Sequence, residues 1–480
     1  MITMSGERSR REFLKISTLG LAATASAEAW NPSPRDAQEG PKSGLTAWTT
    51  AGDDRFRRLP PLAWRKTTGA TSERTVIVDS KVQFQEILGF GAAFTDASCY
   101  LFNQMPSASR ATLLRELFHP SEMNLNVCRT CIGASDYSTS VYSFDEGDPD
   151  PELKRFSIEH DKAYILPMLR EARQQNRELF LFSSPWSPPG WMKANNSMLG
   201  GSMRKKYLGS YAQYFLKFLE AYAAEGVEID AVTPQNEVDT DQDGRMPACL
   251  WGQEYEIEFV GKHLGPLLRE RGLKTKIWIL DHNYNLWGRA ICELDDADLR
   301  KYSNAVAWHG YVGAAEMISK VREVHSDCAM HWTEGGPDYT MPDYATDWVK
   351  WSETFTDVLQ NWCQSITAWN LVLDEKGRPN LGPFPCGGLV TLHSQTGAET
   401  RSGQYHALAH YSRVVRRGAR RIGSTCEMKT VRHVAFQNPE RQQVLVLTNP
   451  EAANVVMVRA GGNEVEVPLA AGSVTTLTWA

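Results

Sequence analysis

Two glutamates stand out because each follows a short apolar run of the chain. Glu237 comes just after the run 231–235, with Asn236 immediately before it, and Glu334 directly follows the run 329–333. Two carboxyl groups that flank one bond can supply a proton donor and a nucleophile, which is the chemistry of glycoside hydrolysis. About 5–5.5 Å between them gives retention of configuration, whereas a wider gap admits water and gives inversion. We therefore expect Glu237 and Glu334 to be the catalytic pair.

Other polar and aromatic side chains follow similar runs and suit a sugar ligand. We expect Asp96 to bind sugar hydroxyls and Asn236 to bind the 2-hydroxyl. Trp186 and Trp369 are expected to offer flat rings to the sugar. Tyr311 is expected to donate a hydrogen bond to Glu334. Three further candidates for substrate binding are His282, His309 and Asn370. Packing roles remain open for each of these residues when it is considered alone.

The histidines and cysteines that could suggest a metal site lack the expected spacing. His282, His309 and His331 raise the question of a metal, but these three histidines do not have an H-x-x-x-H or comparable ligand spacing. Cys128 and Cys131 form a C-x-x-C pair inside an apolar run, without a second pair or a nearby histidine. We expect the nine cysteines to be reduced thiols, and we expect neither a metal nor another cofactor.

Eight short apolar runs alternate with segments of helical periodicity and must position these residues. The runs are 87–95, 125–131, 179–184, 231–235, 276–280, 305–309, 329–333 and 365–371. Eight strand–helix units close a (β/α)8 TIM barrel, whose active site lies at the carboxyl ends of the strands. An open doubly wound sheet would show a glycine-rich phosphate turn after its first strand, and none follows here. The predicted fold class is α/β, a TIM barrel with an attached small β-sandwich.

The chain ends show different patterns from the middle. Residues 1–30 carry Ser9-Arg10-Arg11, a mildly apolar run and small residues, which together predict a twin-arginine signal peptide. Residues 31–44 are predicted to be a linker, and residues 45–79 are predicted to form strands that join the β-sandwich. Residues 80–418 form the predicted catalytic barrel. Residues 419–480 contain period-two runs and form the predicted C-terminal β-sandwich. We expect export to the periplasm or the extracellular space.

The composition of the whole chain narrows the range of partners. The 480 residues include 42% hydrophobic residues and 15 Trp, and their net charge is -6. The chain has no excess of basic residues of the kind that nucleic-acid-binding proteins use. We expect no integral membrane segment once the signal is removed, because no other apolar run is long enough to span a bilayer. The oligomeric state stays open.

Several stretches of the chain together resemble glycoside hydrolase family 30, which contains the relatives of acid glucosylceramidase. The matching stretches are GFGAAFTDA at 89–97, SPWSPPGWMK at 184–193, TPQNE at 233–237, HGY at 309–311, TE at 333–334, WNLVLD at 369–374 and PN at 379–380. The resemblance covers about residues 75–420 and implies a TIM barrel with an attached β-sandwich. It implies that Glu237 is the acid/base and Glu334 the nucleophile. It also places Asp96, Trp186, Asn236, Tyr311 and Trp369 at the subsite for the glycone, the sugar on the nucleophile's side of the scissile bond.

The resemblance predicts a retaining β-glycosidase that acts on a carbohydrate or glycolipid. The expected substrate is a β-glucoside, either glucosylceramide-like or a β-glucan oligosaccharide. Val238 and Ala368 differ from residues common in the family and leave that choice open. The alternatives are a β-1,6-glucanase, a β-xylanase, a β-fucosidase or a non-catalytic carbohydrate-binding protein. Retention of both glutamates argues against the last, because binding alone needs neither a proton donor nor a nucleophile.

Overall fold

The computed structural model describes residues 44–480, and a barrel of parallel strands lies at its centre. The strands follow each other in the order β10-β11-β12-β13-β5-β6-β7-β8-β9. Their bounds are β5 (Gly89–Phe94), β6 (Val127–Cys131), β7 (Phe180–Ser184), β8 (Ala231–Val232), β9 (Lys276–Ile277), β10 (Ile279–Asn283), β11 (Ala305–His309), β12 (Ala329–Glu334) and β13 (Cys363–Ala368). Only Trp278 separates β9 from β10, so the two ends of this order belong to one interrupted strand. The predicted eight-stranded barrel is confirmed.

Burial on both faces explains why these runs are so apolar. Strands β5, β6, β7, β10 and β11 are buried at every residue, as parallel strands covered by helices must be. The main covering helices are α2 (Ser107–Phe118), α4 (Ile165–Gln175), α5 (Leu208–Ala224), α8 (Trp287–Asp295), α10 (Glu316–Val324), α11 (Trp348–Gln360) and α12 (Gly403–Ser412). The segment after β8, whose periodicity predicts one helix over 253–271, instead contains a π-helical stretch at Phe259–Leu264 between two short α-helices.

The β-sandwich combines strands from both ends of the described chain. Its ladder runs β2-β1-β22-β19-β18-β17-β4-β20-β21-β3. The strands are β1 (Thr46–Ala51), β2 (Asp54–Arg58), β3 (Arg65–Lys66), β4 (Thr75–Glu86), β17 (Arg420–Thr425), β18 (Arg432–Gln437), β19 (Gln443–Asn449), β20 (Asn454–Ala460), β21 (Asn463–Leu469) and β22 (Ser473–Trp479). One apolar core takes residues from both halves of this order, including Val76, Leu445, Val456 and Leu477, so the ladder folds over on itself.

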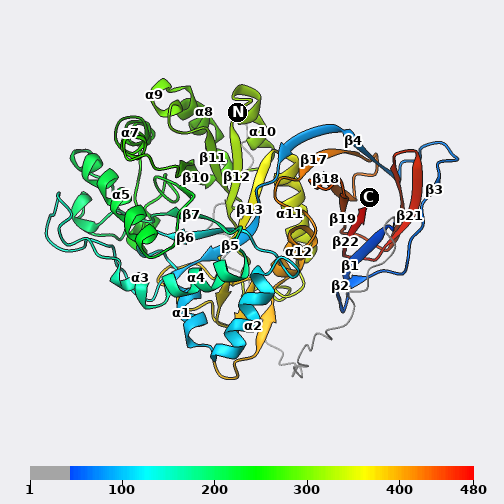
Figure 1. Ribbon diagram of the computed structural model, residues 1–480, viewed down its shortest axis with the longest axis horizontal. Coiled ribbons are helices and arrows are strands. Elements are labelled where there is room, and N and C mark those ends of the chain that lie inside the picture. The colour runs from blue at the N-terminus through cyan, green and yellow to red at the C-terminus, as the bar shows by residue number, and fades with distance from the viewer. Residues whose placement is uncertain (1–43) are drawn as a thin grey trace, which may run out of the picture. The chain divides into compact units, whose positions relative to one another are not determined.

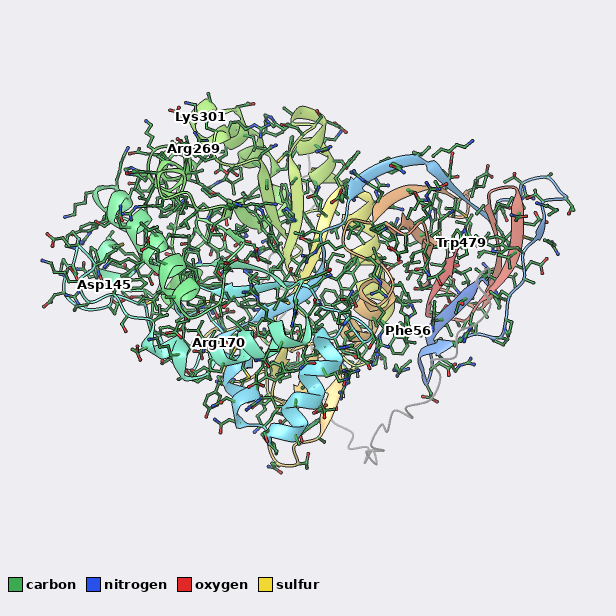
Figure 2. The ribbon with its side chains drawn as sticks, viewed as in Figure 1. Phe56, Asp145, Arg170, Arg269, Lys301 and Trp479 are labelled. Atoms are coloured by element: carbon green, nitrogen blue, oxygen red, sulfur yellow. The ribbon has the colours of Figure 1, made fainter. Side chains whose placement is uncertain are left out.

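Two helices join the sandwich to the barrel. In Figure 1, α11 and α12 lie between the barrel strands and the strands β18, β19 and β22. Trp348 of α11 donates its indole N–H to Gly472 O at 2.9 Å, and His410 of α12 is hydrogen-bonded to Thr476 at 2.8 Å. Figure 2 labels Phe56 beside α12, where its ring meets that of His410 edge-on at 5.0 Å. These contacts fix the sandwich against α11 and α12 on the outside of the barrel.

The predicted signal peptide at 1–30 and all but the last residue of the predicted linker lie outside the described residues. Between residues 44 and 480, none of the helices has the length and apolarity needed to cross a membrane.

Candidate active site

The structure brings Glu237 and Glu334 to the carboxyl-terminal mouth of the barrel. Glu237 lies in the loop that follows β8, and Glu334 is the last residue of β12. Both side chains are almost fully buried. The backbone of Glu237 has a φ of 51°, a left-handed conformation that is rare outside glycine, and its N–H donates to Asp281 O at 3.0 Å. The neighbouring strand therefore holds this glutamate in a strained conformation, which is common at functional sites.

A buried arginine connects Glu334 to the loop that carries Glu237. Arg129 projects from β6, and its guanidinium donates to Glu334 Oε2 at 2.5 Å, to Asn236 Oδ1 at 2.8 Å and to Asp281 Oδ2 at 2.7 Å. Burial opposes the charged form of Arg129, but Asp281 and Glu334 outweigh it and raise the pKa of the guanidinium. Because a guanidinium is planar and rigid, these three contacts fix the relative positions of strands β6, β10 and β12.

Asp281, in the middle of β10, accepts hydrogen bonds from most members of this network. Besides Arg129, the hydroxyls of Ser184, Thr233 and Thr333 donate to its oxygens at 2.7–2.8 Å, and His309 Nε2 lies 3.0 Å away. Burial alone would raise the pKa of Asp281, but Arg129 and His309 hold it well below its usual range. Asp281 is therefore a permanent anion that orients its neighbours.

His309 of β11 lies between three carboxylates. Its Nδ1 is 3.4 Å from Glu237 Oε1, and its Nε2 is 3.0 Å from Asp281 and 3.7 Å from Glu334 Oε2. Burial disfavours the imidazolium, yet Glu334, Asp281 and Glu237 together raise the pKa of His309 to about 9. One protonated ring therefore separates the two candidate catalytic groups and balances part of their negative charge.

Each glutamate also has a neutral donor. Tyr311 donates its phenol O–H to Glu334 Oε1 at 3.1 Å, the hydrogen bond expected from the sequence. Gln242, in the loop after Glu237, donates Nε2–H to Glu237 Oε2 at 2.8 Å. Glu334 thus accepts hydrogen bonds at both oxygens, as suits an ionised nucleophile, while Glu237 has an amide at one oxygen and histidines beside the other.

The predicted glycone-binding residues lie at the same mouth of the barrel. Asp96 begins α1 (Asp96–Gln104) behind the N-cap Thr95, and its oxygens already accept from Thr139 N, His160 and Tyr164. The rings of Trp186 and Trp369 stack with centroids 5.0 Å apart, and Arg129 lies over Trp186 at 4.5 Å. Both tryptophans are almost completely buried, so they pack against Arg129 and leave little ring surface open to a sugar.

The three further candidates and His331 differ in position. His282 is in the site and is hydrogen-bonded through Nε2 to Asp239. Asn370 accepts from Thr95 Oγ1 at 2.9 Å, and its buried Nδ2 has no hydrogen-bond partner within the described residues. His331 faces the opposite end of the barrel, where it stacks on Trp278 beside a cavity of about 870 Å³. That end of a TIM barrel serves stability, and the catalytic pair is absent from the cavity's lining.

Sequence reasoning missed Arg129 and Gln242 as site residues and assigned no role to Asp281, which follows a predicted strand. A signal for Arg129 was available, since it is a charged residue in the middle of an apolar strand, inside the C-x-x-C run. Arginine is almost never fully buried without a partner, so this position required acidic neighbours. Gln242 carried no comparable signal, because its loop gives no regular pattern.

The Asp281 network leads to a stability prediction. Asp281→Asn leaves Arg129 buried with one carboxylate fewer, and breaking a buried ion pair costs about 3–5 kcal/mol. Urea unfolding of the variant is expected to show a loss of this size. The matched control is Asp298→Asn, because Asp298 pairs with Lys301 at the surface and such pairs contribute under about 1 kcal/mol. Equal losses for both variants would contradict the structural role of the network.

Comparisons with known proteins identify the family to which this fold belongs. The family model described as the glycosyl hydrolase family 30 TIM-barrel domain matches residues 87–415, and that described as the family 30 beta sandwich domain matches 418–477. An endo-1,6-beta-D-glucanase of Neurospora crassa is 33% identical over 392 residues, 78% of this chain and 80% of its own. Putative glucosylceramidase 2 of Caenorhabditis elegans is 30% identical over 429 residues, 85% and 83% of the two chains. The solved structure of an endo-beta1,6-glucanase matches with a TM-score of 0.83 and 28% identity, covering 91% of this chain and 99% of its own.

Proposed function

The chain belongs to glycosyl hydrolase family 30 and is therefore an O-glycosyl hydrolase, and from this premise we propose that it cleaves β-1,6-glucan with retention of configuration. The observation that carries the mechanism is the position of His309, which lies 3.4 Å from Glu237 and 3.7 Å from Glu334. Two carboxyl groups, one from the loop after β8 and one from β12, thus approach the same imidazole. They can flank a single glycosidic bond.

The hydrogen bonds divide the roles of the two glutamates. Glu334, which accepts from Arg129 and Tyr311, attacks the anomeric carbon while Glu237 gives a proton to the departing glycosidic oxygen. Glu237 then takes a proton from a water molecule that attacks the same carbon and releases Glu334. Two inversions at one carbon give net retention. Arg129 orients the amide of Asn236 through its oxygen, so that the amide nitrogen can donate to the sugar 2-hydroxyl.

Support for the linkage comes from the relatives. The Neurospora protein and the solved structure are both named as endo-acting β-1,6-glucanases. The Caenorhabditis protein is named as a putative glucosylceramidase and shares 30% identity, against 33% for the glucanase. Glucosylceramide is for that reason the second candidate substrate, and the shared glycone in both cases is a β-linked glucose.

A substrate panel tests this proposal. The purified protein would be given linear β-1,6-glucan, β-1,3-glucan, xylan, an aryl β-fucoside and glucosylceramide in detergent micelles, and reducing sugar would be measured. We expect kcat/KM on β-1,6-glucan to exceed that on each other substrate at least about tenfold, a difference of about 1.4 kcal/mol in transition-state binding. Glu334→Gln prepared in the same way controls for contaminating glucanases.

Two results of the panel would overturn the proposal. Faster turnover of glucosylceramide, xylan or the fucoside would reassign the substrate within the family. Binding of glucan without turnover of any substrate would instead support a carbohydrate-binding protein.

The proposed site of action is outside the cytoplasm, and the support for it is the twin-arginine pattern at Ser9-Arg10-Arg11.

A further inference from the structure

Three side chains of the site are arranged as a set of metal ligands. Glu237, His282 and His309 each offer one ligand atom, these atoms all lie within 4.8 Å of one another, and all three residues are buried. Glu237 Oε1 lies 3.4 Å from His309 Nδ1 and 3.8 Å from His282 Nδ1. From these contacts we propose that the three residues form an inhibitory binding site for a divalent zinc-like cation, which is not required for catalysis.

The distances between the ligand atoms are close to those around a tetrahedral cation. Ligand atoms bound to Zn²⁺ at about 2.0–2.1 Å in a tetrahedral arrangement lie roughly 3.3–3.4 Å apart. The pair formed by Glu237 and His309 already has that separation, and the pair formed by Glu237 and His282 is a few tenths of an ångström wider. Small rotations of the two imidazoles would bring their Nδ1 atoms to a common centre, leaving the fourth position for water.

The outer nitrogens of both histidines provide a second, independent indication. His282 Nε2 is hydrogen-bonded to Asp239, and His309 Nε2 lies 3.0 Å from Asp281. Metal-binding histidines commonly donate their other N–H to a carboxylate, which directs the second nitrogen at the ion. At His309 the ion would displace the Nδ1 proton of the imidazolium. His282 Nδ1 also lies 3.3 Å from the amide nitrogen of Asn283. If Asn283 donates in this contact, Nδ1 is the unprotonated nitrogen that a metal ligand requires, and the ion would replace the hydrogen bond.

The charge and chemistry of the site define the class of ion. Four carboxylates surround the two imidazoles, those of Glu237, Asp239, Asp281 and Glu334. Two imidazoles and one carboxylate suit zinc and related transition metals, whereas Mg²⁺ and Ca²⁺ prefer sites made of oxygens alone. The inhibition rests on the proposed role of Glu237, because an oxygen that ligates the ion cannot deliver a proton to the leaving group. The binding itself does not rest on that role.

Calorimetry with Zn²⁺ tests the site. The protein would first be treated with EDTA and dialysed, and every variant would carry Cys292→Ser to remove the exposed thiol. We expect one Zn²⁺ to bind per chain, with loss of glycosidase activity in proportion to occupancy. Mg²⁺ at the same concentration is expected to do neither. Substitution with Co²⁺ should give the visible absorption of a low-coordinate site.

Two variants and a matched control locate the ion. His282→Gln removes a ligand, and Asp239→Asn keeps all three ligands but weakens the outer hydrogen bond, which typically costs 10–100-fold in metal affinity. Both are expected to raise the Kd for Zn²⁺ at least about tenfold. His263→Gln is the control, because His263 pairs with Glu258 at 3.8 Å outside the site, and its Kd should stay unchanged.

The outcomes separate this proposal from the proposed function. Unchanged Zn²⁺ affinity in both His282→Gln and Asp239→Asn, or full activity of the zinc-saturated protein, would overturn the inhibitory site. Neither result would affect the assignment of a glycosidase, which depends on turnover in the absence of metal. Conversely, if this protein had no glucanase activity, calorimetry and the Co²⁺ spectrum would still show whether the ion binds at the proposed site.

Discussion

Glu334→Gln is expected to lower kcat on an aryl β-glucoside by at least about 10⁴-fold while the fold stays intact. The amide has the same shape as the carboxylate, so its one oxygen can still accept from Arg129 while its NH2 group faces the hydroxyl of Tyr311, which can accept. It has no negative charge with which to attack the anomeric carbon, and no covalent intermediate can form. Steady-state kinetics measures the loss, and thermal unfolding checks that the variant is folded.

A glutamate outside the site provides the control for this variant. Glu323 pairs with Lys320 at the surface of α10, and Glu323→Gln should keep the wild-type rate. If Glu334→Gln retained more than about a tenth of the wild-type kcat, Glu334 would not be the nucleophile.

Glu237→Ala is expected to produce the second-largest loss, and the size of the loss should depend on the leaving group. General acid catalysis contributes about 10²–10⁴-fold, so hydrolysis of β-1,6-glucan, whose leaving group is a poor one, should fall within this range. A dinitrophenyl β-glucoside leaves without a proton, and its first step should proceed at nearly the normal rate. The glycosyl-enzyme should then accumulate, since no base activates water. Burst kinetics measures this change in the rate-limiting step.

Azide gives this variant a distinct chemical signature. It needs no base, so it should restore turnover of the dinitrophenyl substrate and yield the β-glucosyl azide, because it attacks an α-linked intermediate. A product of the α configuration would show that the removed carboxylate had been the nucleophile, which would exchange the roles of Glu237 and Glu334.

Much of this arrangement could be predicted from the sequence because a TIM barrel couples chain position to spatial position. Each apolar run ends at the same mouth, so Glu237 and Glu334 had to meet there once eight runs were counted. The same logic placed Tyr311 and Trp369, which directly follow their strands. His331 fell outside the site because it comes before the end of β12 and points into the opposite end of the barrel.

The rest depended on contacts that the sequence does not encode locally. Arg129 meets Glu334 across 205 residues of chain, and Gln242 reaches Glu237 from an irregular loop with positive φ at Gln242 itself. The tryptophans illustrate a different limit. A flat ring after a strand is expected to offer its face to a sugar, but Trp186 and Trp369 stack on each other and both side chains are almost completely buried.

Labelling with a 2-deoxy-2-fluoro-β-glucoside that carries a good leaving group tests the central claim most directly. The fluorine slows both steps, so a retaining enzyme accumulates its covalent glycosyl-enzyme, which mass spectrometry of peptides can locate. We expect one label per chain, on Glu334, and a matching loss of activity. Labelling of Glu237 or of any other residue would contradict the assignment, and so would inversion of anomeric configuration during hydrolysis, followed by NMR.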